Sequence, residues 1–251
     1  MVLSATSRGM AAVQHMTGDE SERVRALSPE TLALATKLVK RGEVVVIPTD
    51  TVYGIACDPF SEQAIEKIFQ AKRRPHTKAL QVLLPSVESI AELSLKLPTP
   101  LEVLAEAFLP GAFSPICEAQ EECGLATVHE DGALRTQGVR VPDSEASRRV
   151  LQATGPVAAS SANISGMPSA QTAQEAYAQL GDSVALYVDA GPTPGPVAST
   201  VVEADCAGED GIRILRVGVI PETAVRKVLH DNTGLGDAMP CHTEETGNAR
   251  A

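Results

Sequence analysis

The sequence predicts an α/β fold in a single domain, because short apolar runs typical of buried strands alternate with segments of helical periodicity. The clearest strand is the β-branched run at 44–47, a pattern that suits burial on both faces of a sheet. Before it, Ser28 and Pro29 supply an N-cap and a first-turn proline for a helix. The alternation continues without a linker, so we expect one domain over 28–230, with flexible tails over 1–27 and 231–251.

The remaining elements follow from the same signals. Ser61 begins a second helix with apolar residues on one face, and this helix must end before Pro75. Thr172 and Glu175 form a capping box for a later helix. Other helices are expected at 87–95, 100–108 and 144–153 and after Pro221, and other strands at 80–84, 139–141, 156–159, 184–188, 199–202 and 212–215.

Charge and composition limit the partners that this chain can bind. Its 251 residues include 21 Lys and Arg against 32 Asp and Glu, a net charge of −11, with no Trp, three Tyr and four Phe. A broad nucleic-acid surface needs positive potential and stacking aromatics, so the surface as a whole is not expected to attract nucleic acid. A basic pocket inside an acidic shell remains compatible with these numbers.

The five cysteines lie at irregular positions and form no C-x-x-C pair, so they predict neither a zinc site nor a disulfide framework. The chain has no run of about 18 apolar residues, which a membrane span would need. Its first 27 residues lack the apolar core of a secretory signal. We therefore expect a cytoplasmic protein in a reducing compartment, with no membrane contact.

The segment 72–78 is strongly basic in this acidic chain. It holds four Lys and Arg residues, and no acidic residue lies between Glu66 and Glu88. Planar Arg forks and mobile Lys charges together suit phosphate groups at several distances, or a carboxylate. The alternative is a helix C-terminus, where each cation stabilises the helix dipole by about 0.3–1 kcal/mol.

Two polar loops and two arginines complete the candidate binding groups. The loops at 49–54 and 160–166 each follow an apolar strand, where open α/β sheets bind ligands, although ordinary polar turns explain them too. Arg140 and Arg216 lie in apolar strand-like segments, where an unpaired buried charge is costly. They either face solvent or point into a cleft that holds an anion. The chain has no P-loop, G-x-G-x-x-G or G-x-S-x-G motif, so P-loop phosphate binding and a hydrolase nucleophile are unsupported.

In this order, the segments resemble the threonylcarbamoyl-AMP synthase family (YrdC/TsaC-like proteins) from about Leu32 to Leu229. The resemblance is carried by PTDTVYG at 48–54, K-x-R-P at 72–75 with Lys78, VAA at 157–159 before S-x-N at 161–163, and STVV at 199–202. Each motif is short and weak alone. Their shared order along the chain makes the resemblance specific.

The resemblance implies a fold and a reaction that composition and spacing do not reach. The implied fold is a twisted, largely open α/β sheet flanked by helices around a large positively lined cavity. The implied enzyme is a nucleotidyltransferase that forms threonylcarbamoyl-AMP and pyrophosphate from L-threonine, bicarbonate and ATP. The product feeds the threonylcarbamoyladenosine modification at tRNA position 37, through a downstream threonylcarbamoyl transferase complex. A weak contact of this chain with tRNA is also expected.

The resemblance also assigns roles to individual residues. The implied catalytic residues are Lys72, Arg74, Ser161 and Asn163. The implied ATP-binding residues are Lys72, Arg74, Lys78, Thr136, Ser161, Asn163, Ser169 and Arg216. The implied threonine-binding residues are Thr51, Arg140, Ala159 through its backbone, and Ser199.

The implied reaction needs positioning and charge neutralisation more than a covalent nucleophile, because anions meet at the α-phosphorus. Mg²⁺ would arrive with ATP and keep several waters, so we expect no dedicated metal-ligand cluster. Cys57 is expected to pack in the core. The chain departs from the family pattern in ways that alter loops but remove no assigned side chain, at Ala79, Ala112, Ser144, Ala198 and Val217.

Two other functions fit parts of the sequence. The first is a non-catalytic nucleotide- or RNA-binding module of the same fold. The second is a related carbamoyl transferase with another acceptor, as in the similar domain of hydrogenase-maturation proteins, whose zinc-finger-like cysteine motifs are missing here. Threonine-dependent ATP turnover separates the leading hypothesis from the first alternative, and competition between threonine and serine separates it from the second.

Overall fold

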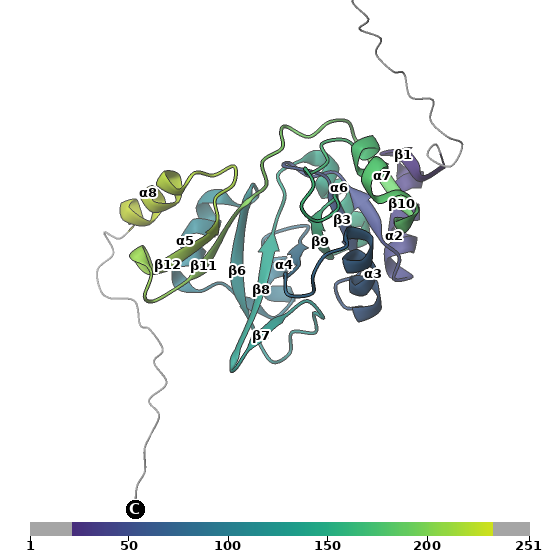
Figure 1. Cartoon of the computed structure of the whole chain (residues 1–251). Coiled ribbons are helices and arrows are strands. Elements are labelled where there is room, and N and C mark those ends of the chain that lie inside the picture. Colours follow the sequence, from purple (N-terminus) through teal and green to yellow (C-terminus); the bar gives the residue numbers. More distant parts are fainter. Residues whose placement is uncertain (1–21, 233–251) are drawn as a thin grey trace, which may run out of the picture.

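The computed structural model describes residues 22–232 (Figure 1). Its strands are β1 (Val24–Ala26), β2 (Val45–Ile47), β3 (Gly54–Cys57), β4 (Gln81–Leu83), β5 (Leu95–Lys96), β6 (Phe113–Ala119), β7 (His129–Asp131), β8 (Leu134–Arg140), β9 (Val157–Ser161), β10 (Leu186–Asp189), β11 (Thr200–Ala204) and β12 (Ile212–Arg216). Its α-helices are α2 (Pro29–Lys40), α3 (Glu62–Lys72), α4 (Ser89–Glu92), α5 (Thr99–Phe108), α6 (Glu145–Thr154), α7 (Ala173–Leu180) and α8 (Glu222–Asn232).

The strands form one mixed, twelve-stranded sheet in the order β1-β10-β2-β3-β9-β4-β8-β6-β11-β12, with β5 paired to β6 and β7 paired to β8. Parallel pairs such as β10 with β2 stand beside antiparallel pairs such as β2 with β3. Helices flank the sheet along its length (Figure 1). The predicted α/β class, with an open sheet flanked by helices, is therefore confirmed.

The run at 44–47 is buried on both faces, as its composition predicts. Val45 and Ile47 pack with α2 and α6, whereas Val44 and Val46 pack with α3 and α7. Successive side chains of a strand point to opposite faces, so a continuous apolar run serves two cores at once. This double burial fixes β2, and with it the start of the loop that follows at residue 48.

A separate core supports the other end of the sheet. The helices α5 and α8 pack together against β6, β11 and β12, with Leu104, Phe113, Val202 and Leu229 among the buried side chains. Figure 1 places α5 and α8 beside β11 and β12, at the end of the sheet away from α2 and α7. This third core includes Ile212 of β12, the strand from which Arg216 extends.

Local signals gave most helix starts correctly. The Ser28 hydroxyl accepts the Thr31 N–H at 3.2 Å at the start of α2, and Ser61 caps α3 in the same way. The assignment of residues 24–26 to a tail is wrong, because β1 pairs in parallel with β10. A three-residue edge strand that contains Arg25 has no periodicity to reveal it. The rest of the two predicted tails lies largely outside the described residues.

Four further strands, β3, β5, β6 and β7, were not predicted, and the helix expected at 87–95 is wrong at Leu95, which begins β5. In the part of the chain that the structure describes, no helix combines the length and apolar character that a membrane crossing requires.

Candidate active site

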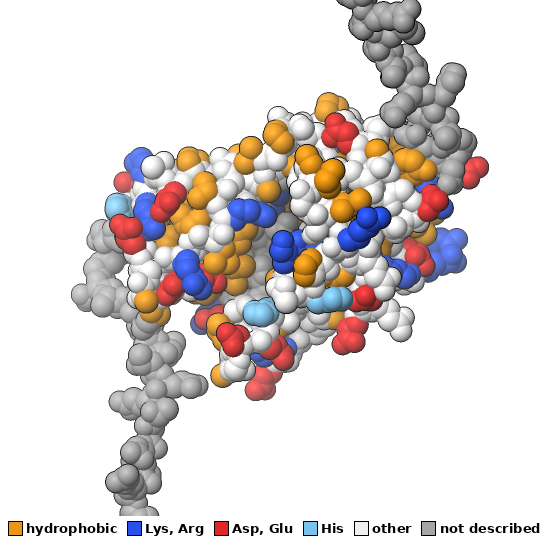
Figure 2. Space-filling view, viewed as in Figure 1, with side chains coloured by type: hydrophobic (Ala, Val, Ile, Leu, Met, Phe, Trp, Pro, Cys, Tyr) orange, Lys and Arg blue, Asp and Glu red, His pale blue; other side chains and the backbone are white. Residues whose placement is uncertain are grey.

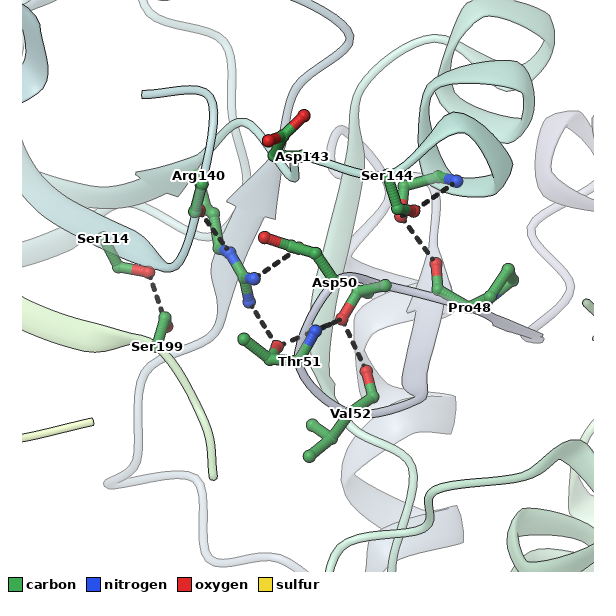
Figure 3. Close-up of polar contacts among 12 residues, drawn as sticks. Pro48, Asp50, Thr51, Val52, Ser114, Arg140, Asp143, Ser144 and Ser199 are labelled. Carbon is green, nitrogen blue, oxygen red and sulfur yellow. Dashed lines mark hydrogen bonds and ion pairs between the residues drawn. The ribbon is translucent and has the colours of Figure 1, made fainter. Parts of the chain in front are cut away.

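Arg140, at the end of β8, is a charged residue with only 2% of its surface exposed. Figure 3 shows its guanidinium beside Asp50 and Thr51. Its guanidinium donates from Nη2 to Asp50 Oδ1 at 2.5 Å, from Nη1 to Thr51 Oγ1 at 2.7 Å, and from Nε to the Gly111 carbonyl at 3.0 Å. Burial lowers the pKa of Arg140, and Asp50 opposes that shift. A solvent-facing Arg140 is therefore excluded. Two of its five N–H groups remain for a ligand.

The loop between β2 and β3 brings Thr51 to this guanidinium. The Thr49 hydroxyl folds the loop, because it donates to the Val52 carbonyl at 2.6 Å and accepts the Thr51 N–H at 3.1 Å. The hydroxyl of Ser147 in α6 donates to the Pro48 carbonyl at 3.1 Å. The polar loop predicted from the sequence is thus a closed turn, held at both ends.

Arg216, the last residue of β12, is held by Ser199. Its Nε donates to the Ser199 carbonyl at 2.9 Å, and its Nη2 donates to Ser199 Oγ at 3.1 Å. The Ser199 hydroxyl lies 2.8 Å from that of Ser114 (Figure 3), which donates to Gln81 Oε1 at 2.9 Å. Arg216 is exposed and forms no ion pair with any residue in 22–232. Its remaining N–H groups are open to a ligand.

Lys72, the last residue of α3, is 1% exposed. Its Nζ donates to the carbonyls of Ser161 at 2.5 Å and Asn163 at 2.6 Å. Burial, followed by the charge of Arg74, lowers the pKa of Lys72 to about 7. Lys72 therefore ties the end of α3 to the loop after β9, and one of its three ammonium N–H groups remains for a ligand.

Arg74 is half-buried beside the same segment. It donates to the carbonyls of Lys78 at 3.4 Å and Ala79 at 2.9 Å, so the chain from 74 to 79 curls around the guanidinium. Burial lowers its pKa. The Lys78 side chain is exposed, and in the described part of the chain neither Arg74 nor Lys78 forms an ion pair.

Arg216 is affected by the charges of two arginines from distant segments of the chain. Desolvation, followed by the charges of Arg140 and Arg74, lowers the pKa of Arg216. Like charges disfavour each other's charged form, so Arg140 and Arg74 both oppose the positive charge of Arg216. Figure 2 shows Lys and Arg side chains on both sides of a hollow in the middle of the face. Among residues 22–232, Asp50 is the one carboxylate that pairs with this group.

Two open pockets occur among the described residues. A pocket of about 250 Å³ includes Thr49, Asp50 and Ser144 in its wall, and one of about 560 Å³ opens beside Phe60 and Gly124. Neither pocket has a Lys or Arg in its wall. The large positively lined cavity that the resemblance implies therefore stays a prediction.

The remaining residues to which the resemblance assigns a role are Asn163, Ala159, Thr136 and Ser169. Asn163 is 6% exposed, and its Nδ2 donates to the carbonyls of Ile164 and Met167 while Oδ1 is buried without a partner. Ala159 is buried in β9, next to Gln81 of β4. No hydrogen bond described in residues 22–232 joins the side chains of Thr136 or Ser169 to the arginines.

Sequence reasoning missed Asp50, Ser114 and Gln81. Asp50 was visible only as part of a motif, and its role as the partner of Arg140 depends on a contact 90 residues apart in sequence. Ser114 and Gln81 are ordinary residues until the sheet brings them together.

The cysteines have no catalytic setting among the described residues. Cys57 is fully buried in the core, as expected, and burial raises the pKa of its thiol to about 12. Cys117 and Cys123 are also buried and free, whereas Cys206 is disulfide-bonded, which the spacing did not predict. Within 22–232, no three His, Cys, Asp or Glu side chains are grouped so as to hold a metal ion.

A family model for Sua5, YciO and YrdC proteins, described as "Telomere recombination", matches residues 37–218. The chain belongs to this family. A Mycobacterium tuberculosis relative (strain H37Rv) is 37% identical over 195 residues, which cover 78% of this chain and 87% of the relative. The threonylcarbamoyl-AMP synthase of Bacillus subtilis is 32% identical over 223 residues, which cover 87% of this chain and 63% of that protein.

A solved structure of the family also matches. Pyrococcus abyssi Sua5, complexed with L-threonine, superposes with a TM-score of 0.71 at 30% identity, over 82% of this chain and 59% of that one. This chain thus spans about three fifths of the lengths of the B. subtilis and P. abyssi family members.

Proposed function

We propose that this chain is an L-threonylcarbamoyladenylate synthase, which forms threonylcarbamoyl-AMP and pyrophosphate from L-threonine, bicarbonate and ATP. The observation that carries the proposal is a set of three arginines, Arg74, Arg140 and Arg216, each held by hydrogen bonds that leave some of its N–H donors unused. Two anions, the amino-acid carbamate and the triphosphate, need such a group in order to approach each other. The family members named for this reaction and the L-threonine complex of Sua5 support the same assignment.

The proposed chemistry uses no covalent nucleophile. The threonine nitrogen takes up CO₂ from bicarbonate, with loss of water, and a carbamate oxygen then attacks the α-phosphorus while pyrophosphate leaves. Arg140 and Thr51 would hold the threonine end, and Arg74, Lys72 and Arg216 would face the phosphates. Catalysis then consists of positioning the two substrates and neutralising their negative charge. The chain's cations, which the fold already holds in place, would supply that neutralisation.

Mg²⁺ is proposed to enter bound to ATP. Phosphate oxygens and water supply most of its ligands, since Mg²⁺ dehydrates reluctantly. This chain would contribute the cations that surround the phosphates. Transfer of the labile product to a threonylcarbamoyl transferase complex, for tRNA position 37, and a weak contact with tRNA belong to the same proposal.

The product itself tests this proposal. The full chain is incubated with ATP, Mg²⁺, ¹³C-bicarbonate and L-threonine, and the mixture is analysed at once by mass spectrometry. We expect an adenylate that carries one ¹³C and one threonine, and none when threonine is omitted. ATP binding without this product would support a non-catalytic nucleotide-binding module instead.

Lys72 should link ATP binding to a proton. Its pKa of about 7 leaves much of it neutral at pH 8, and a triphosphate nearby favours the charged form, so binding should take up a proton. ATP affinity should fall between pH 7 and pH 9, by up to about tenfold per pH unit. Calorimetry in two buffers of different ionisation enthalpy measures this uptake at pH 8. In Lys72→Met the uptake should vanish, and its persistence there would assign it to another group.

A further inference from the structure

A chain of hydrogen bonds runs through two buried serines from the middle of the sheet to Arg216. It joins Gln81 of β4, Ser114 of β6 and Ser199 beside β11 to Arg216 of β12, with successive distances of 2.9, 2.8 and 3.1 Å. Ser114 and Ser199 are each 1% exposed. Arg216 is the one exposed member.

The chemistry of the groups gives this chain a direction. A guanidinium only donates, and the Gln81 Oε1 atom only accepts. The single proton of Ser114 is donated to Gln81, so Ser114 accepts the proton of Ser199. Ser199 Oγ is then turned toward Arg216 as an acceptor. All three bonds point inward, an arrangement in which each bond polarises the next.

We infer that Gln81 and Ser114 are positioning residues, which act through Ser199 to orient the Arg216 guanidinium toward the anion. β12 lies at the edge of the sheet, and a long side chain on an edge strand loses rotamer freedom only if something holds it. The Ser199 carbonyl holds Nε of Arg216, and the relay holds Nη2 by connecting this edge residue to β4 and β6. The inference rests on the proposed function only in taking Arg216 to face the ATP phosphates.

Two variants of the same shape test the relay. Ser114→Val and Ser114→Thr both add bulk, but only threonine keeps the hydroxyl. Calorimetric titration with inorganic pyrophosphate and with Mg·ATP should show about a tenfold loss of affinity in Ser114→Val and nearly full affinity in Ser114→Thr. Pyrophosphate binding does not require turnover, so this readout stands even if threonine-dependent synthesis is absent.

A cycle with Arg216→Met decides whether Ser114 acts through Arg216. In that background the valine and threonine variants should bind pyrophosphate equally. If the tenfold difference persists without Arg216, Ser114 supports the fold and not the guanidinium, and the inference is overturned. Should Ser114→Val fail to fold, Gln81→Met removes the terminal acceptor and should give the same loss and the same cycle. Full pyrophosphate affinity in Gln81→Met would also overturn it.

Discussion

Replacing Arg140 by methionine should be the most damaging single change to this protein. The substitution leaves the Asp50 carboxylate, which is 12% exposed, without its cation. Breaking a buried ion pair by removing one partner costs about 3–5 kcal/mol of the free energy of unfolding. Threonine-dependent turnover should also fall by about 10²-fold or more, because the guanidinium is the proposed anchor of the substrate. Urea unfolding and steady-state kinetics measure the two effects.

The double variant Arg140→Met/Asp50→Asn separates stability from function. Removing the orphaned charge should restore most of the lost free energy of unfolding, because an amide is cheaper to bury than a carboxylate. Turnover should stay low. Recovery of turnover together with stability would show that Arg140 only maintains the fold, and would remove it from the threonine site.

Arg74→Met should lower kcat/KM for ATP-dependent turnover by about 10²- to 10³-fold, with little change in melting temperature. Arg74 holds only carbonyls in the described structure, without an ion pair, so its charge is available to phosphates. A neutral side chain of similar length cannot stabilise the charge that develops as pyrophosphate leaves.

Arg73 provides the matched control for this prediction. It is the neighbouring, exposed arginine, and it is the C-cap of α3, with a left-handed backbone at φ 50°. Arg73→Met removes the same charge from the same segment, but it should keep most of the activity. Equal losses in the two variants would mean that the segment acts by its overall charge, as a helix terminus does, and that Arg74 has no specific role.

The sequence was most informative where a local pattern determines local structure. The apolar run at 44–47 and the Ser28 and Ser61 caps each specify an element without distant partners, and each was predicted correctly. β6 was not predicted. It contains Pro115, and a proline in the sequence argues against a central strand. Its pairing with β8 and β11 outweighs the lost donor, and such pairing is invisible to local reasoning.

In the candidate site, too, local patterns indicate some residues but not the distant contacts that these residues make. Arg140 and Arg216 were recognisable because a charge in an apolar strand needs an explanation. The sequence did not indicate which of the two arginines is buried. That depends on Asp50, which is far from Arg140 in sequence and pairs with Arg140 alone. Lys72 was expected among the phosphate ligands, and its two bonds to the loop after β9 add a structural role that no spacing could show.

Pyrophosphate release tests the central claim most directly. Purified full chain is given ATP, Mg²⁺ and bicarbonate, and release is followed with and without L-threonine, beside the Arg74→Met variant. We predict release that depends on threonine in the unmodified chain and is nearly absent from the variant. Bound ATP without threonine-dependent release would contradict the account, and would leave the three arginines as a nucleotide-binding site alone.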